Sequence, residues 1–245
     1  MEIVVLKMLF IASVSAQYGK HKYVQRYFTW QDAQQFCINH YMDLSPISTP
    51  WVEEELKNAT IGKISERFWI GLYRNETQWK WSGGGDASNI PWAEGEPHDY
   101  LSEWVASVCW QGCKWIGWHN VKPSRELPFF CFNLIVVEYE KTWEQAMSYC
   151  REEHTALTSL ASEAEQLLAL REIKPNRITK RVWIGLRYLA DRWLWVNSDP
   201  LEYEAWPKGG VQDHQCPIRN RCGALTKEGL WENWDCQDKL NFICY

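Results

Sequence analysis

The side chains best able to do chemistry in this 245-residue chain are nine cysteines and six histidines, and neither set has the spacing of a catalytic centre. The sequence contains no Gly-x-Ser-x-Gly turn, no His-Glu-x-x-His helix and no Gly-rich phosphate loop. One group has metal-like spacing, because three residues separate Cys109 from Cys113 and His119 follows. A short disulfide between these two cysteines is the alternative. The sequence therefore predicts a binding protein rather than an enzyme.

The N-terminus and the cysteine count indicate where the protein works. Residues 1–16 (MEIVVLKMLFIASVSA) are mostly apolar and end in small residues, which is typical of a secretory signal peptide; a buried first strand or helix is the alternative. No later stretch has the roughly 18 uninterrupted apolar residues of a membrane span. Cysteines of a secreted protein form disulfides, and an odd number leaves at least one without a partner in the chain. We therefore predict a secreted, extracellular protein.

Three blocks of sequence occur twice, in the same order. TWQDAQQFC (29–37) returns as TWEQAMSYC (142–150), RFWIGLYRNETQWKW (67–81) as RVWIGLRYLADRWLW (181–195), and LPFFCF (127–132) as LNFICY (240–245). The shift is 113 or 114 positions, which indicates a duplicated domain, since a solenoid repeats every 20 to 50 residues or so. We predict two domains, 22–133 and 134–245.

Each half has the pattern of two helices followed by short strands. Trp30, Ala33 and Cys37 share one helix face behind Thr29 as N-cap, and the copy at 142–150 repeats this pattern. Second helices are predicted in TPWVEEELKNA (49–59) and SEAEQLLALREI (162–173). The WIGL and Trp-x-Trp segments are typical of strands, and a long polar stretch follows them. The predicted fold class is α+β, with two helices, a small antiparallel sheet and one long irregular loop in each half.

These motifs resemble the C-type lectin-like domain, here in a tandem two-domain secreted form. The Trp/Cys helix, WIGL, Trp-x-Trp, WAEGEP (92–97), GLWENWDC (229–236) and the closing Phe-x-Cys carry the resemblance. The resemblance implies three disulfides: Cys37–Cys131, Cys150–Cys244 and Cys222–Cys236.

The remaining cysteines differ between the halves. In the first half, Val105 and Pro123 occupy the two positions that Cys222 and Cys236 hold in the second. We interpret Cys109–Cys113 as a short bridge, with zinc as its alternative. Cys216 is left over, either free or joining two chains as a disulfide-linked homodimer.

The resemblance also implies where calcium and a sugar would bind. Family members that bind sugar hold calcium with Glu-Pro-Asn, a later Glu and an Asn-Asp pair. The first half has Glu96, Pro97, His98, Glu103, His119 and Asn120 at these positions. Imidazole is a poor calcium ligand and the Asn lacks the Asp charge, so calcium binding at domain 1 is expected to be weak or lost. Two Glu and two His would instead suit zinc or copper, and a solvated loop on a decayed site is the other interpretation.

The second half departs further from the pattern. Gln212, Asn220, Glu232 and Asn233 stand at the corresponding positions, after Gly210 and Val211 in place of Glu and Pro. At most one carboxylate of the set remains, so no calcium is expected there.

Other residues bear on the surface of the first half. Asn58 and Asn75 begin Asn-x-Thr sequons and predict N-linked glycans on exposed positions. Trp104, Trp110 and Trp115 are not framework positions of the family. They would form a ligand platform if exposed, or add packing near the cysteine hairpin.

We therefore predict a secreted, non-enzymatic protein that binds a carbohydrate or protein ligand through its long loops, with weak or absent calcium dependence. The formal charge of −5 gives no reason to expect a nucleic-acid partner. Two alternatives remain: a calcium-dependent lectin acting through domain 1, and a disulfide-linked structural or matrix protein. An innate defence role is implied by the resemblance alone.

Overall fold

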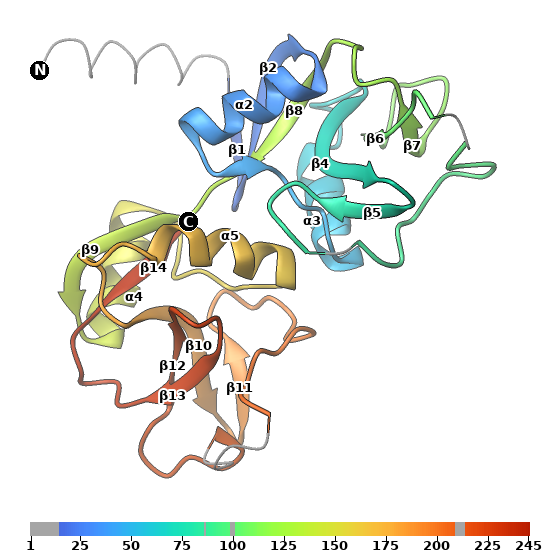
Figure 1. Cartoon of the computed structure of the whole chain (residues 1–245). Helices are drawn as coiled ribbons and strands as arrows, with labels where there is room; N and C mark the ends of the chain where they lie inside the picture. The colour runs from blue at the N-terminus through green and yellow to red at the C-terminus, as the bar shows by residue number, and fades with distance from the viewer. Residues whose placement is uncertain (1–14, 86, 99–100, 209–213) are drawn as a thin grey trace, which may run out of the picture. The chain divides into compact units, whose positions relative to one another are not determined.

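The computed structural model describes residues 15–85, 87–98, 101–208 and 214–245. The chain divides into two units, the first ending at Asn133 and the second beginning at Leu134 (Figure 1). Most of the predicted signal segment, 1–16, lies outside the described residues. Its last two residues begin strand β1 (Ser15–Tyr18), which pairs with β2 (His21–Phe28).

Four helices begin at capped positions. The Thr29 hydroxyl accepts the Asp32 N–H at 3.3 Å, and Thr142 forms a reciprocal capping box with Gln145. Caps of this kind satisfy N–H groups that have no partner within the helix. The helices are α2 (Trp30–His40) and α3 (Pro50–Thr60) in the first unit, and α4 (Trp143–Glu153) and α5 (Glu163–Ile173) in the second.

Each unit contains one sheet, and the two sheets have the same order of equivalent strands. The first is ordered β1-β2-β8-β4-β6-β7, and the second β13-β12-β10-β14-β9. Read from its other end, the second order matches β2-β8-β4-β6-β7 strand for strand. The further strands of the first are β3 (Asp43–Leu44), β4 (Phe68–Asn75), β5 (Gln78–Trp81), β6 (Val105–Cys109), β7 (Gly117–Val121) and β8 (Leu127–Phe132). Those of the second are β9 (Ile135–Lys141), β10 (Arg181–Leu189), β11 (Arg192–Trp195), β12 (Cys222–Thr226), β13 (Trp231–Trp234) and β14 (Leu240–Cys244).

The α+β class is confirmed, and the sheets are mixed. In each, one strand pair is parallel: β4 with β8, and β10 with β14. The expected antiparallel sheet did not include this pair, which arises because β8 lies between β2 and β4, and β14 lies between β9 and β10. Figure 1 shows α2 lying beside β2 and β8, where Trp30, Ala33 and Cys37 are buried.

Disulfides join the first helix of each unit to its last strand. The structure contains Cys37–Cys131 and Cys150–Cys244, each closing 94 residues, together with Cys222–Cys236 and Cys109–Cys113. These are the pairs that the sequence and the resemblance suggested. In the loop-entropy model, a bridge that closes a loop of this length stabilises the fold by about 4 to 5 kcal/mol.

The first unit has uncharged residues where the second unit has its shorter disulfide, Cys222–Cys236. Val105 pairs with Tyr73 as Cys222 pairs with Arg187, and both Val105 and Cys222 are fully buried. The Pro123 carbonyl accepts the N–H of the first helix residue, as the Cys236 carbonyl does in the second unit. Val105 and Pro123 therefore hold the positions of the missing bridge, as predicted.

His21, at the start of β2, is a buried ionisable group in the first unit. Its Nδ1 lies within hydrogen-bond distance of the Ser45 hydroxyl, and its Nε2 has no hydrogen-bond partner among the described residues. Burial, with a smaller effect from the charge of Lys20, lowers the pKa of His21 from 6.5 to about 3. The second unit carries Leu134 at the corresponding position, one residue before its first strand.

Stability of the first unit should fall as the pH drops below 6.5. Between pH 6.5 and 3 the unfolded chain binds a proton at His21 that the folded chain excludes, so this group stabilises the fold fully above 6.5 and progressively less below it. We expect up to about 1.4 kcal/mol of lost unfolding free energy per pH unit from this group. Urea unfolding of the wild-type chain and of His21→Leu between pH 7.5 and 5 measures it. An unchanged slope in the variant would contradict the assignment.

Candidate functional site

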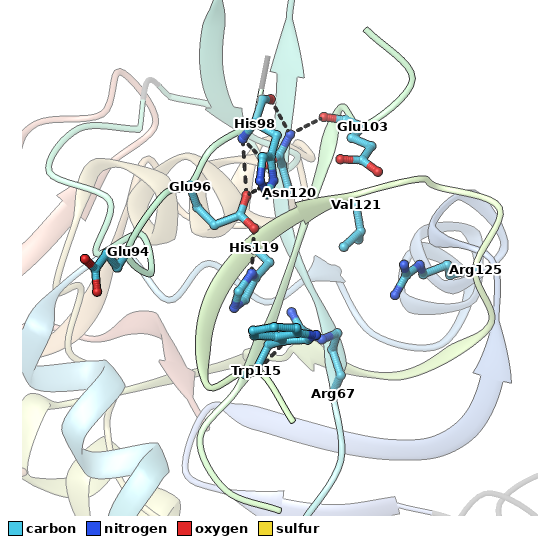
Figure 2. A pocket seen from close by; sticks show the side chains of 10 residues that line it. All are labelled: Arg67, Glu94, Glu96, His98, Glu103, Trp115, His119, Asn120, Val121 and Arg125. Atoms are coloured by element: carbon cyan, nitrogen blue, oxygen red, sulfur yellow. Dashed lines mark hydrogen bonds and ion pairs between the residues drawn. The ribbon is translucent and has the colours of Figure 1, made fainter. Parts of the chain in front are cut away.

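The long loop that precedes β6 meets strand β7 at a pocket in the first unit. The pocket has a volume of about 450 Å³ (Figure 2). It brings together the five polar residues predicted from the resemblance, which are Glu96, His98, Glu103, His119 and Asn120. Its lining is Arg67, Glu94, Glu96, His98, Glu103, Trp115, His119, Asn120, Val121 and Arg125.

Glu96 lies between the two histidines at the pocket wall. One carboxylate oxygen is 2.9 Å from His98 Nδ1, and the other is 2.7 Å from His119 Nδ1. A carboxylate only accepts, so both Nδ1 atoms carry a hydrogen and donate it to Glu96. The Glu96 side chain is only 6% exposed, and the Glu96–Pro97 peptide bond is cis. Both oxygens of this buried carboxylate are therefore occupied by ring N–H groups.

Asn120, on β7, ties the long loop to the sheet through three hydrogen bonds. Its Oδ1 accepts the His98 backbone N–H at 2.8 Å. Its Nδ2 donates to the His98 carbonyl at 2.8 Å and to the Glu103 carbonyl at 3.0 Å. This network admits one orientation of the amide, because exchanging its oxygen and nitrogen would place like groups together at all three contacts. Asn120 therefore points hydrogens at the loop carbonyls.

The donor set does not fit calcium. Calcium binds six to eight oxygens, and here both Glu96 oxygens accept imidazole N–H groups. Two loop carbonyls accept the Asn120 amide, whose hydrogens would repel a cation placed between them. The loop is held by hydrogen bonds at the positions where the resemblance placed the ion.

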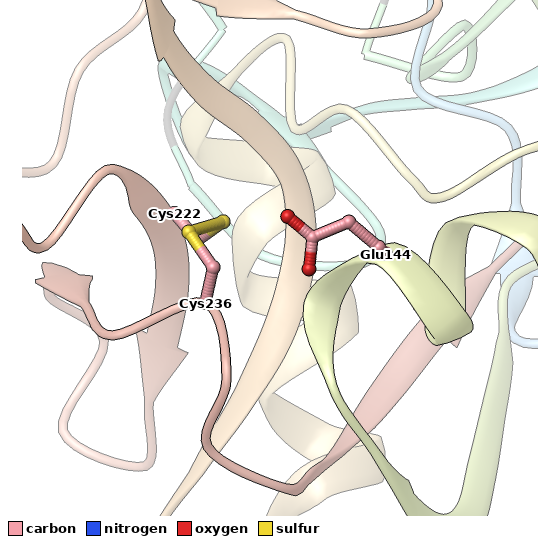
Figure 3. A group of neighbouring side chains, drawn as sticks. All are labelled: Glu144, Cys222 and Cys236. Atoms are coloured by element: carbon pink, nitrogen blue, oxygen red, sulfur yellow. A yellow bond between two sulfur atoms is a disulfide. The ribbon is translucent and has the colours of Figure 1, made fainter.

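The alternative zinc site at Cys109, Cys113 and His119 is not formed in the described part of the chain. Cys109 and Cys113 are bonded to each other, so they do not combine with His119 as a zinc site. Within residues 15–85, 87–98, 101–208 and 214–245, the one close cluster of metal-ligating side chains is Glu144 with Cys222 and Cys236. Figure 3 shows that the two sulfurs of this cluster form the disulfide, which leaves no thiolate for a metal.

In the second unit, two of the corresponding residues, Glu232 and Asn233, make other contacts. Asn233 Nδ2 lies 3.3 Å from the Asn220 carbonyl, as Asn120 lies near that of Glu103. Glu232 Oε2 is 2.7 Å from Arg181 Nε. Gln212 lies outside the described residues. The carboxylate that the sequence left available for calcium is thus engaged by an arginine.

The sequence reasoning missed the two arginines of the first pocket. Arg67 donates to the Ser107 hydroxyl at 3.0 Å and to the Trp115 carbonyl at 2.8 Å. The pKa of Arg67 is lowered by burial and then by the charge of Arg125, while Glu96 raises it. Arg67 is visible in the sequence as the first residue of the repeated RFWIGL block. Only the fold places it in the same pocket as Arg125.

The three extra tryptophans have different environments. Trp104 contacts Trp30 edge to face, with ring centroids 5.9 Å apart, and is partly buried. Trp110 packs its ring against Phe68. Trp115 is 60% exposed at the pocket. The packing interpretation therefore holds for Trp104 and Trp110, and Trp115 alone is available as a platform.

Glu53, on α3, accepts hydrogen bonds from two tryptophan indoles, one of which lies on β7. One of its carboxylate oxygens accepts Trp118 Nε1 at 2.6 Å and Trp110 Nε1 at 3.0 Å. In the second unit, Gln166 of α5 accepts Trp231 Nε1 at 2.7 Å. Glu53 thus fixes both β7 and the segment that follows β6, which together carry one side of the pocket.

The comparisons with known proteins agree with the fold. The family model described as the lectin C-type domain matches residues 27–131 and 139–245. The chain is 24% identical to the secretory phospholipase A2 receptor of Bos taurus, over 93% of this chain and 18% of that protein. It is 21% identical to the C-type mannose receptor 2 of Rattus norvegicus, over 94% of this chain and 19% of that protein. The chain thus spans about a fifth of the length of these relatives.

Shorter proteins match single parts of the chain. The C-type lectin 1 of Hydrophis hardwickii is 29% identical over 42% of this chain and 66% of that protein. Among solved structures, human lithostathine is similar at a TM-score of 0.41 and 27% identity, covering 45% of this chain and 88% of that one.

Removing the Glu53 carboxylate should destabilise the first unit. Glu53→Ala leaves two indole N–H groups without their acceptor, so we expect a loss on the order of 1 to 3 kcal/mol. Glu53→Gln keeps an acceptor, as Gln166 does, and should retain most of the stability. Urea unfolding followed by tryptophan fluorescence measures both variants. The control is Glu54→Ala, an exposed residue of the same helix; an equal effect of Glu53→Ala and Glu54→Ala would contradict the anchoring role.

Proposed function

Because the chain belongs to the C-type lectin domain family, we propose that it is a secreted, non-enzymatic protein that binds a carbohydrate or protein ligand without calcium. The binding region is the long-loop pocket of the first domain. The names of two relatives contain a sugar, mannose, and a protein, phospholipase A2, and both kinds of ligand are compatible with a pocket of mixed charge and an exposed indole.

The observation that carries this proposal is the amide of Asn120. In a calcium site of this shape, the ion would gather the loop oxygens. Here an N–H group gathers the carbonyls of His98 and Glu103, and two ring N–H groups cover the Glu96 carboxylate. These hydrogen bonds hold the loop closed without an ion, so the pocket is organised before any ligand arrives.

Surface features support an extracellular role. Both predicted glycosylation residues, Asn58 and Asn75, are exposed. Four disulfides are consistent with an oxidising compartment. Within the described residues, no helix has the length and apolar character needed to cross a bilayer.

Restoring the family's oxygen ligands should create calcium binding where the natural chain has none. We expect calorimetric titration of the wild-type chain with calcium to give no saturable heat up to millimolar concentration. His98→Asn, His119→Asn and Asn120→Asp together return amide oxygens and a carboxylate, and this triple variant should bind calcium. The matched control is Asn233→Asp in the second domain, which lacks the remaining ligands. Micromolar calcium binding by the wild type would contradict the proposal.

A second candidate function rests on Cys216, which is exposed and has no disulfide partner in the structure. We propose that it can join two chains. Secreted protein should then run at twice the monomer mass on a non-reducing gel, and Cys216→Ser should run as a monomer. A monomeric wild type under non-reducing conditions would contradict this candidate and leave the binding function unaffected.

A further inference from the structure

Two guanidinium groups, those of Arg67 and Arg125, line the first pocket without a direct ion pair among the described residues. Arg67 donates only to a hydroxyl and a backbone carbonyl, and its pKa is lowered by burial and by the charge of Arg125. In the part of the chain that the structure describes, neither Arg67 nor Arg125 forms an ion pair. Glu96, whose charge raises the pKa of Arg67, already accepts two imidazole N–H groups. Two guanidinium groups that line one pocket and make no ion pair are free to share an anionic group of a ligand.

The second domain provides an internal comparison. Arg181, the counterpart of Arg67 in the repeated block, pairs with Glu232 at 2.7 Å and lies over the Trp234 ring at 3.9 Å. Glu232 stands where the first domain has His119, and Asp238 stands where it has Arg125. The first domain thus has a histidine and an arginine where the second has two acids. The pair of arginines without an ion pair is therefore present in one copy alone.

An exposed aromatic surface adjoins these charges. The segment from Val105 to Trp118 is four residues longer than its counterpart from Cys222 to Trp231, and the Cys109–Cys113 disulfide closes part of it. This longer segment carries Trp115, whose carbonyl accepts from Arg67 and whose ring lies 4.8 Å from the Lys114 ammonium. The disulfide and the hydrogen bond from Arg67 to the Trp115 carbonyl hold this residue at the pocket. The Lys114 ammonium covers one face of the Trp115 ring.

We propose that this pocket binds an acidic saccharide, one that carries sulfate or carboxylate groups on its sugar rings. The inference rests on the proposed calcium-independent function and names its ligand class. Arg67 and Arg125 would bind the anionic group, because a guanidinium presents paired N–H donors that match two oxygens of such a group. Trp115 would pack against the apolar face of a sugar ring.

The other polar groups of the pocket suit sugar hydroxyls. Figure 2 shows the Glu103 side chain at the far end of the pocket from Trp115. A carboxylate there accepts hydroxyl hydrogens, which an uncharged part of a saccharide supplies. It also repels a ligand that is anionic along its whole length. This combination favours a sugar with a localised negative charge over an acidic peptide.

The test measures binding of four probes to the full-length chain in EDTA by calorimetry. The probes are 3′-sulfolactose (one sulfate), 3′-sialyllactose (one carboxylate), lactose (neutral) and a polyglutamate peptide. We expect one or both acidic saccharides to bind, and the neutral sugar and the peptide to bind at least tenfold more weakly. Arg125→Glu should weaken binding by about tenfold to a hundredfold, the range for one lost charge-assisted contact. Trp115→Ala should also weaken it.

The control variant is Lys239→Glu, which makes the same change of charge at an exposed position of the second domain. It should leave binding unchanged. Equal losses in Arg125→Glu and Lys239→Glu, or equal binding of polyglutamate, would show attraction to net charge alone and overturn the inference. Binding of only the neutral sugar in EDTA would overturn it too, while leaving the calcium-independent function intact. No binding of any probe would also overturn it. Binding that appears only when calcium is added would overturn both proposals.

Discussion

The bridge between the first helix and the last strand is the constraint on which each domain depends. It closes 94 residues in both copies, and nearly all the domain, including the long loop, lies within that closed segment. The helix cysteine is fully buried together with the tryptophan that begins the same helix. The bridge and the helix therefore stabilise the sheet that carries the long loop.

The long loop of the first domain is held to β7 by hydrogen bonds. A bound cation attracts several oxygens, and removing it leaves those oxygens to repel one another. Asn120 supplies two N–H groups to the loop carbonyls, and two imidazoles supply N–H groups to Glu96. Each substitution exchanges an oxygen ligand or a charge for a donor, so the changes act in the same direction. The loop remains attached to β7, and the pocket beside it remains open to ligands.

Much of the fold could be predicted from the repeated blocks, and less of the site. Thr29, Thr142 and Ser162 mark the starts of helices because capping is a local interaction. The parallel strand pair depends on the order of strands in the sheet, which local patterns do not contain. Histidines at the ligand positions predicted weaker calcium binding. The direction of the Asn120 amide could not be predicted, because it is decided by carbonyls 17 and 22 residues away.

Comparing the two copies explains why the pocket charges escaped prediction. Arg67 and Arg181 are the same residue type in the same repeated block, so the sequence alone treats them alike. Their electrostatic environments differ because of what faces them: His119 and Arg125 in one copy, and Glu232 and Asp238 in the other. The charge of Arg181 is neutralised within the protein, whereas a partly buried arginine that shares a pocket with a second arginine and forms no ion pair can bind an anion from outside. The two copies thus differ in the charges around equivalent arginines on the same kind of sheet.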